Sequence, residues 1–356
     1  MLEVVADPKS TPLPLASHVV RWIDDLFKTS AYGFREIVLT CIAAWRAGID
    51  FDPRVDFYKC NPRPVFEKGV RPALRAAGIP HMKSGPLNVA KNINKIDDDW
   101  AKGRRPESAA FAAVRILDWM LQGNLQQQKQ SQDAVLDALL RRLLLEASRL
   151  QALSVTPRTD FTLYTCWNFL MSFVTQAPDA GNTPQVVVGL ILQQLFRCSS
   201  LTVWEGGKAC ETNLTAKKPA DIWIEGQGGA VEHLYEVTVK PIDQNRIQDS
   251  ADSVLTYGKS HNEVVWLCRL PADIAPLGIV ESSVLEYKGI RFEFVDLAKW
   301  MLGSLEILGV TGRLAVFERL NKYVDRPETS ENAKKVWQQL NCRARELKLA
   351  TDGGAK

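Results

Sequence analysis

The residues best suited to chemistry lie in one stretch, KKPADIWIEGQGGAVEHLYEVTVK, which runs from Lys217 to Lys240. Two of its four acids, Asp221 and Glu236, are candidates for chemistry, and the stretch ends on the amine of Lys240. Carboxylate oxygens are preferred ligands of Mg²⁺, an ion that keeps several waters and also binds phosphate oxygens. The bound ion stabilises charge on a phosphate and lowers the pKa of its water, and a nearby lysine can orient that water or neutralise the transition state. The three side chains therefore predict phosphodiester hydrolysis, provided that the fold brings them together.

A β-hairpin is the element predicted to position these side chains. Its strands would cover residues 221–224 and 233–240, and the glycines of residues 226–229 would supply the positive φ of a tight turn. Side chains alternate between the two faces of a strand, so Glu236, Thr238 and Lys240 would share one face. Charged residues also alternate on the solvent face of ordinary antiparallel strands, so the hairpin alone leaves both interpretations open.

The segments around the hairpin predict a mixed sheet with helices. Residues 185–199 fit a helix or a buried strand, and their length favours a helix. Residues 242–258 predict a further helix. The near-continuous apolar run at 263–268 is typical of a central strand, and 289–295 alternates like another strand. The predicted fold class is thus α/β (α+β) with a mixed central sheet. Glu205 and Glu211 lie before the hairpin, where either could add a metal carboxylate or be an ordinary loop acid; Glu205 is the slightly better candidate.

Helical periodicity dominates both flanks of this core. Apolar residues recur at helical intervals in residues 17–48, 107–154 and 161–175, and again in residues 296–349. We therefore expect three parts: a largely helical, basic region over residues 1–180, a core with the metal site over 181–300, and C-terminal helices packed on that core over 301–356.

Positive charge is concentrated in residues 54–105. This segment has twelve basic and five acidic residues, a net of +7, whereas the rest of the chain sums to −4. Such an uneven distribution of charge is typical of a protein that binds a polyanion. A rigid polar loop over residues 79–88 adds amide groups that can pair with adenine. The alternative is a solvated linker between helices. The predicted DNA-binding residues are Lys83, Ser84, Asn88, Lys91, Arg104 and Arg105.

The composition and the absence of certain motifs exclude several classes of protein. The chain has 356 residues, of which 46% are hydrophobic and 24% charged, as in ordinary globular proteins. Its seven cysteines form no CxxC pair and its four histidines are not at metal-ligand spacing, which argues against a zinc site. No P-loop motif is present, and neither a signal peptide nor an apolar run of about 18 residues is evident. We therefore expect a cytoplasmic protein without an ATP-driven motor.

The hairpin and its flanking elements resemble the PD-(D/E)xK nuclease superfamily, whose core is a helix, a β-hairpin with Asp and Glu-x-Lys, then a helix and further strands. Pro219-Ala220-Asp221 stands where the family has Pro-Asp. The family places an acid two residues before its lysine, but Thr238 occupies that position relative to Lys240, and Glu236 comes two residues earlier on the same face. Residues 57–91, together with KKPADI and EVTVK, are similar to the SacI-type restriction endonuclease family.

This resemblance implies a type II restriction endonuclease: a homodimer that cuts double-stranded DNA at a short palindromic site with Mg²⁺ as cofactor, and a cognate DNA methyltransferase in the same system. Asp221, Glu236 and Lys240 would be catalytic, and Asp221, Glu236 and Glu205 would hold the metal. Two other classes stay open. One is a non-catalytic DNA-binding or assembly protein with a degenerate nuclease core, which the displaced acid favours; the other is a helical regulatory protein with an incidental hairpin.

Overall fold

A computed structural model describes residues 11–28, 32–82, 84–151, 162–205, 213, 217–258, 261–281 and 283–353. The chain is a mixed α/β protein that divides into two compact units. Residues 1–153 and 326–331 form the first unit, and residues 154–325 and 332–356 form the second. The boundary lies before α10 (Leu163–Gln176), because this helix packs into the core of the second unit. The sequence analysis divides the chain at residue 180, whereas the two compact units divide after residue 153.

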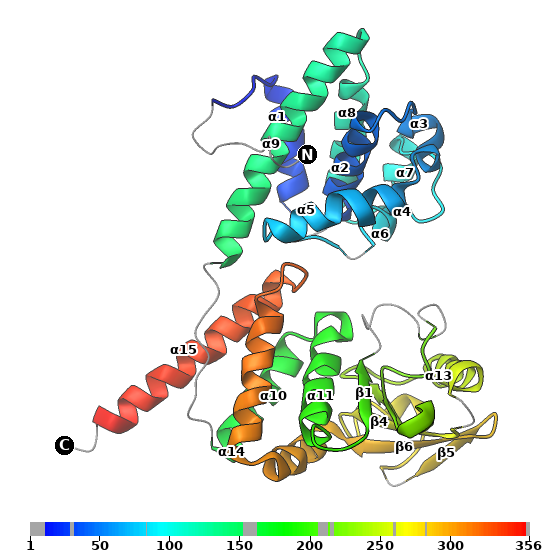
Figure 1. The fold of residues 1–356 in the computed structure, drawn as a ribbon, viewed down its shortest axis with the longest axis vertical. Helices are drawn as coiled ribbons and strands as arrows, with labels where there is room; N and C mark the ends of the chain where they lie inside the picture. The colour runs from blue at the N-terminus through cyan, green and yellow to red at the C-terminus, as the bar shows by residue number, and fades with distance from the viewer. Residues whose placement is uncertain are drawn as a thin grey trace. The chain divides into compact units, whose positions relative to one another are not determined.

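The first unit consists of helices in its described residues and has one hydrophobic core (Figure 1). Helix α2 is its central element, since twelve consecutive residues, from Gly33 to Ala44, are buried. Alanines on α8 let it pack closely: Ala109, Ala110, Ala112 and Ala113 are all buried. The helices of this unit are α1 (Ser17–Phe27), α2 (Gly33–Arg46), α3 (Pro53–Asp56), η1 (Phe57–Cys60), α4 (Pro62–Pro64), η2 (Val65–Val70), α5 (Arg71–Ala76), α6 (Leu87–Ala90), α7 (Asp98–Ala101), α8 (Glu107–Met120) and α9 (Leu125–Gln151).

The second unit is organised around a six-stranded sheet of order β1-β2-β3-β4-β6-β5. Strands β1, β2 and β3 pair antiparallel, β3, β4 and β6 pair parallel, and β5 pairs antiparallel with β6. Strand β3 is therefore an inner strand with a different pairing on each side. The strands are β1 (Thr202–Glu205), β2 (Ile222–Glu225), β3 (Val231–Val237), β4 (Glu263–Cys268), β5 (Val284–Tyr287) and β6 (Ile290–Asp296).

Helices cover both faces of this sheet (Figure 1). On one face, α10, α11 (Asn182–Leu195), α14 (Leu297–Val324) and α15 (Glu331–Gly353) pack in a core with Ile222, Ile224 and Val237. On the other face, α13 (Gln244–Tyr257) packs in a separate core with Leu234 and Trp266. Short turns complete the unit, namely η3 (Asp179–Gly181), η4 (Gln227–Gly229) and η5 (Ala275–Leu277). Residues 234–237 of β3 are therefore buried or half-buried between the two layers of helices.

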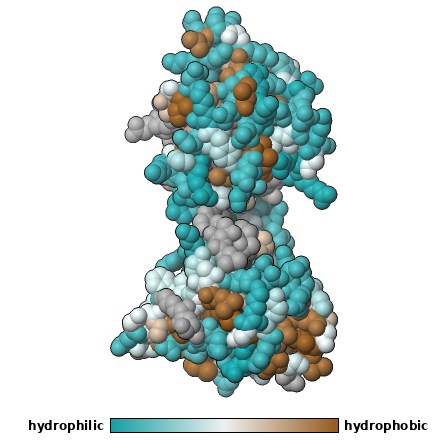
Figure 2. Space-filling model, turned by 90° about the vertical axis from the view of Figure 1, so that its right-hand side faces the viewer, coloured by the Kyte–Doolittle hydropathy of each residue, from teal (hydrophilic) through white to brown (hydrophobic). Residues whose placement is uncertain are grey.

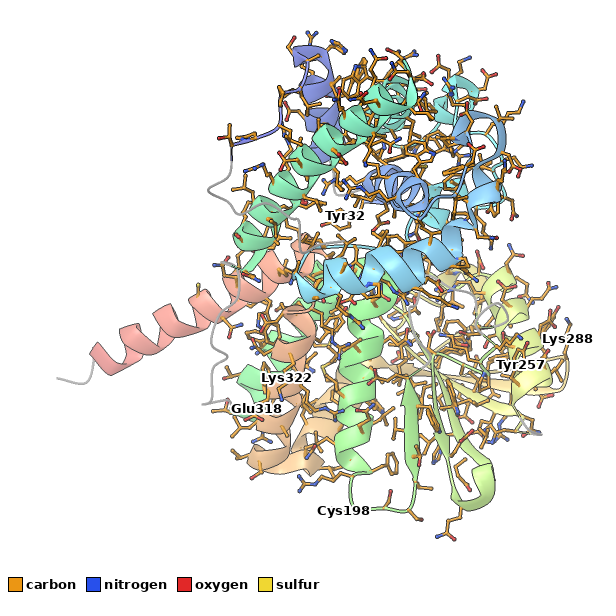
Figure 3. The ribbon with its side chains drawn as sticks, turned by 45° about the horizontal axis from the view of Figure 1, so that its top comes forward. Tyr32, Cys198, Tyr257, Lys288, Glu318 and Lys322 are labelled. Carbon is orange, nitrogen blue, oxygen red and sulfur yellow. The ribbon has the colours of Figure 1, made fainter. Side chains whose placement is uncertain are left out.

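Most of the elements predicted around the hairpin are present. The helix of 185–199 is α11, the helix of 242–258 is α13, and the strands of 263–268 and 289–295 are β4 and β6. Strands β1 and β5 were not predicted, because each has only four residues and is half-exposed at an edge of the sheet. Lys288 lies in the turn between β5 and β6, where Figure 3 labels it. Its Nζ forms an ion pair of 2.6 Å with Asp252 of α13.

Helix α14 is the one described helix that is long and apolar enough to cross a membrane. Its buried residues, including Met301 and Phe317, pack in the core with α10 and α11. Gly309, with φ 60° and ψ −172°, interrupts the helical backbone near its middle. Length and composition alone do not distinguish a membrane span from the core helix of a globular unit.

The surface view in Figure 2 is mostly hydrophilic, with hydrophobic residues in separate small patches. Exposed apolar side chains include Leu145 on α9, Tyr164 on α10 and Val284 on β5. Single exposed apolar side chains are normal on globular proteins and do not by themselves mark an interface.

We predict that Trp337→Ala weakens the second unit. The fully buried indole of Trp337 lies 5.1 Å from Phe169, 5.0 Å from Phe173 and 6.0 Å from Phe317, measured between ring centroids, so it joins α15 to α10 and α14. Removing such a side chain leaves a cavity and costs about 3–5 kcal/mol in the free energy of unfolding. Urea unfolding followed by circular dichroism should show an earlier transition. The control is Tyr164→Ala, whose side chain is 63% exposed; an equal midpoint for the two variants would contradict the prediction.

Candidate active site

The pairing of β2 with β3 brings two carboxylates together. Ile222 lies opposite Tyr235 and Trp223 lies opposite Leu234, so one more step along the same register places Asp221 opposite Glu236. Directly opposed residues of an antiparallel pair project to the same face, with Cβ atoms about 4.5–5.5 Å apart. Both side chains are buried, at 8% and 5% exposure. The structure thus brings together the two acids that the sequence predicted to act together.

Backbone and helix contacts fix the position of Asp221. Its Oδ2 accepts a hydrogen bond of 3.2 Å from the backbone N–H of Val237 on β3. Its backbone carbonyl accepts a bond of 2.9 Å from Nε2 of Gln185, which is a buried residue of α11. Asp221 is therefore held from the neighbouring strand and from the helix on the opposite face of the sheet.

Two donors hold the carboxyl group of Glu236. Nδ2 of Asn213 donates to Oε1 at 2.6 Å, and Oγ of Ser250 on α13 donates to the same oxygen at 3.1 Å. Because both donors use Oε1, the other oxygen, Oε2, is less engaged by neutral donors. Helix α13 therefore contributes an orienting group as well as apolar cover.

Burial raises the pKa of Glu236 well above its usual value of 4.5. The negative charge of Asp221 and a hydrogen bond between the two carboxyl groups raise this pKa further, whereas Lys218 and the bond from Ser250 oppose the rise. Two neighbouring carboxylates in a poorly hydrated site cannot both be ionised unless a cation joins them. The pair is consequently a site that holds either a proton or a cation.

Lys218 is a functional candidate that the sequence analysis missed. Its Nζ lies 3.5 Å from Oδ1 of Asp221, and its side chain is only 3% exposed. Within the described part of the chain this Nζ makes no hydrogen bond. An ammonium group buried without hydrogen-bond partners is costly and is therefore uncommon away from functional sites. The available sequence signal was the Lys-Lys-Pro start of the hairpin segment, three residues before Asp221.

The placement expected for Lys240 was wrong. Strand β3 ends at Val237, so the alternation that would have aligned Lys240 with Glu236 stops before residue 240. The backbone turns there, with the N–H of Lys240 donating 3.1 Å to Oγ1 of Thr238, and the Lys240 side chain is exposed. The amine near the carboxylates is that of Lys218, which arrives from the segment before β2.

A second basic group lies beside Thr238. Nη1 of Arg246, in the first turn of α13, donates 3.0 Å to Oγ1 of Thr238 and 3.3 Å to the carbonyl of Pro241. The guanidinium carbon lies 5.1 Å from the ring centroid of Trp266 on β4, which pairs in register with Glu236. Thr238 therefore connects the end of β3 to a partly exposed arginine.

Glu205 does not lie with the other two acids. It pairs with Ile222 across β1 and β2, so it projects to the face covered by α11. There its Oε1 accepts a bond of 2.9 Å from Nε2 of Gln193. A one-residue difference in strand parity separates this face from that of Asp221. The alternative acid, Glu211, lies outside the described residues.

The described residues contain no group of three or more His, Cys, Asp or Glu side chains arranged to hold a metal. The candidate centre thus offers two carboxylates. That donor set fits Mg²⁺, which proteins commonly bind through one or two carboxylates together with waters and substrate phosphates. It does not fit a structural zinc site, which needs four protein ligands of the nitrogen or sulfur type.

The predicted DNA-binding residues all belong to the first unit. Lys91 and Arg105 are exposed. Asn88 is also exposed, but its Nδ2 donates 2.9 Å to the carbonyl of Gly85, so one amide hydrogen is used within the loop. Arg104 is half-buried: its Nε donates 3.2 Å to the carbonyl of Trp100. Ser84 is half-buried, and Lys83 lies outside the described residues.

Acidic partners neutralise part of the basic segment. Arg54 pairs with Asp52 at 2.6 Å, Arg75 with Glu328 at 2.6 Å, and Lys102 with Asp99 at 2.7 Å. These contacts use acids that lie both inside and outside residues 54–105. The net charge of the segment therefore overstates the positive charge that remains available to a polyanion.

No protein-family model matches this sequence, and no curated protein matches it either.

We predict that Glu236→Gln stabilises the protein at neutral pH and flattens its pH dependence. Between pH 4.5 and the raised pKa, the folded state keeps a proton on Glu236 that the unfolded state has released, so stability falls as pH rises. The neutral amide removes this dependence, while its oxygen can still accept from Asn213 and Ser250. Melting temperatures measured from pH 4.5 upward test this, with Glu232→Gln, an exposed residue of the same strand, as the control. Parallel profiles for parent and Glu236→Gln would contradict it.

Proposed function

We propose that the second unit is a metal-dependent nuclease core that hydrolyses phosphodiester bonds in DNA. The observation that carries the proposal is the buried pair of opposed carboxylates, Asp221 and Glu236, with the buried ammonium group of Lys218 beside it. A stable core gains little from two acids that face one another in a sheet, because the pair must be neutralised. Such costly arrangements concentrate at functional sites.

The order of elements supports a core of the PD-(D/E)xK type. A helix, α11, is followed by the antiparallel strands β1, β2 and β3, then by α13 and by β4 parallel to β3. Asp221 comes immediately before β2 and Glu236 lies on β3, where the resemblance expects its two acids. With Glu236 as the acid of the motif, Thr238 occupies the lysine position. Lys218 then supplies the amine from the adjacent segment.

Asp221 and Glu236 are the residues that would hold Mg²⁺. The bound ion supplies charge stabilisation to a phosphate oxygen and acidifies a water molecule. The raised pKa of Glu236 favours the protonated acid, so this carboxyl group would have to lose its proton to serve as a metal ligand. The hydrogen bonds from Asn213 and Ser250 would keep Glu236 in position in both states.

Lys218 would orient the attacking water or neutralise charge that develops on the phosphate. The water oxygen bonds to phosphorus, the bond from phosphorus to one sugar oxygen breaks, and a proton passes to that oxygen. A cation held in a site of low polarity stabilises this transition state strongly, because little solvent screens its charge. Arg246, which is partly exposed and bonded to Thr238, would contact a phosphate.

For the whole chain we propose a type II restriction endonuclease that acts as a homodimer on a short palindromic site in double-stranded DNA. The twofold symmetry of such a site matches that of two identical subunits. Exposed Lys91 and Arg105 of the first unit would contact the DNA backbone or bases. We further propose a cytoplasmic location and a cognate DNA methyltransferase in the same system, which need not touch this protein.

A non-catalytic DNA-binding protein with a degenerate nuclease core is the second candidate. The observation that favours it is the departure from the motif, since Thr238 takes the lysine position and only two carboxylates meet among the described residues. This candidate predicts binding of duplex DNA without cleavage at any concentration of Mg²⁺.

We predict that Asp221→Ala lowers cleavage of plasmid DNA to below about one-hundredth of the parent rate, because it removes a metal ligand from the reacting centre. Duplex binding, measured by gel shift, should persist. In the parent, Mg²⁺ should also raise the melting temperature by binding the folded state, whereas Asp221→Ala should lose this shift. Discrete bands that vanish with EDTA would identify a restriction enzyme. Parent-like cutting by Asp221→Ala would place the site elsewhere.

The two lysines are distinguished by a pair of matched substitutions. We predict that Lys218→Met reduces the cleavage rate by about 10²–10³-fold, because it removes a buried charge from the centre. Lys240→Met should retain cleavage within a few-fold, since the Lys240 side chain is exposed. Single-turnover rates with both variants at saturating Mg²⁺ test this. The opposite ranking would restore Lys240 as the catalytic amine.

A further inference from the structure

A pair of indoles lies on the same face of the sheet as the two carboxylates. Trp204 on β1 is directly opposite Trp223 on β2, with an angle of 15° between the rings and 6.2 Å between their centroids. One carboxylate fixes both rings: Nε1 of Trp204 donates 2.9 Å to Glu225 Oε2, and Nε1 of Trp223 donates 3.3 Å to Oε1. The N–H edges of the rings are thus occupied, whereas their flat faces are not used by these bonds.

The outer indole of the pair is open to solvent. Trp223 is partly buried against the core under α13, but Trp204 is 46% exposed. Strand β1 is an edge of the sheet, so no strand of the described chain covers the side of Trp204 that faces away from Trp223. An exposed large aromatic side chain, fixed in orientation by a hydrogen bond, loses little conformational entropy when a flat ligand stacks on it.

The indole pair is one step along the sheet from the candidate centre. Trp223 follows Asp221 by two residues, and Leu234 precedes Glu236 by two on the partner strand. Two residues of strand span about 6.4–6.8 Å. Trp204 lies one strand further out, about 4.7–4.9 Å to the side. A phosphate at the carboxylates and a base on the outer indole would therefore be separated by roughly 10 Å, which is within the reach of one to two nucleotides.

We propose that Trp204 and Trp223 form a stacking platform for one unpaired nucleobase next to the phosphate that is cleaved. The proposal rests on the nuclease function above and specifies its substrate: the nucleotide at the site is single-stranded or turned out of the duplex. In a paired duplex both faces of each base are already stacked on neighbours, so only an unstacked base can offer a face to the indoles. Stacking on aromatic side chains tolerates any base, because every base has a π-face.

Binding assays test the platform without relying on cleavage. The full chain with Asp221→Asn, a substitution chosen to prevent cleavage, is titrated with a fluorescent single-stranded oligothymidylate and with a duplex of mixed sequence, and anisotropy is measured. We expect Trp204→Ala in this background to weaken single-strand binding about tenfold. Trp204→Phe should recover most of that loss, since a flat face is restored. Tyr164→Ala, which removes an aromatic ring that is 63% exposed on α10, should change nothing.

Each alternative gives a different result. Unchanged single-strand affinity in Trp204→Ala, or a loss that Trp204→Phe does not recover, would overturn the platform. An altered sedimentation coefficient of Trp204→Ala with unchanged DNA affinity would also overturn the platform, because it would assign the indoles to a protein interface. If the parent cuts DNA but Trp204→Ala leaves the single-strand affinity unchanged, the platform fails and the nuclease function stands. If Trp204-dependent single-strand binding occurs in a chain that never cuts, the platform stands and the nuclease function fails.

Discussion

The second unit depends on the opposition of two carboxylates inside a sheet that is covered on both faces. Asp221 and Glu236 are placed together by the register of β2 and β3, and helices on either side exclude water from them. Two negative charges at that distance repel strongly in a site of low polarity, so the pair requires a proton or a cation. The raised pKa of Glu236 is the physical expression of this requirement.

The surroundings of the pair are explained by the same constraint. Asp221 accepts a hydrogen bond at its backbone carbonyl from Gln185 of α11. Glu236 accepts hydrogen bonds from Asn213 and from Ser250 of α13. Lys218 brings a positive charge to 3.5 Å from Asp221. None of these contacts removes the need for a counter-charge between the acids. The arrangement therefore fixes the orientation of both carboxyl groups, and the proposed function assigns a metal ion to the place between them.

Several elements could be predicted from the sequence because they depend on local pattern. The continuous apolar run of β4, the alternation of β6 and the helical spacing of α13 are properties of neighbouring residues, and the structure has all three elements. Asp221 and Glu236 could also be recognised as a facing pair, since the glycine turn fixes which strands pair. The short edge strands β1 and β5 were missed, because four half-exposed residues carry too weak a pattern.

The sequence by itself determined which reactive side chains are available, since it places several acids and lysines in and around one hairpin. Only the tertiary structure decided which of them meet. Glu205 projects to the opposite face of the sheet, because it pairs with Ile222 rather than with a residue on the face of Asp221. Lys240 does not align with Glu236, because β3 ends three residues earlier, at Val237. Lys218 lies at the carboxylates because the segment before β2 directs its side chain toward Asp221. Strand ends and burial arise from contacts between residues distant in the chain, and a local pattern does not contain them.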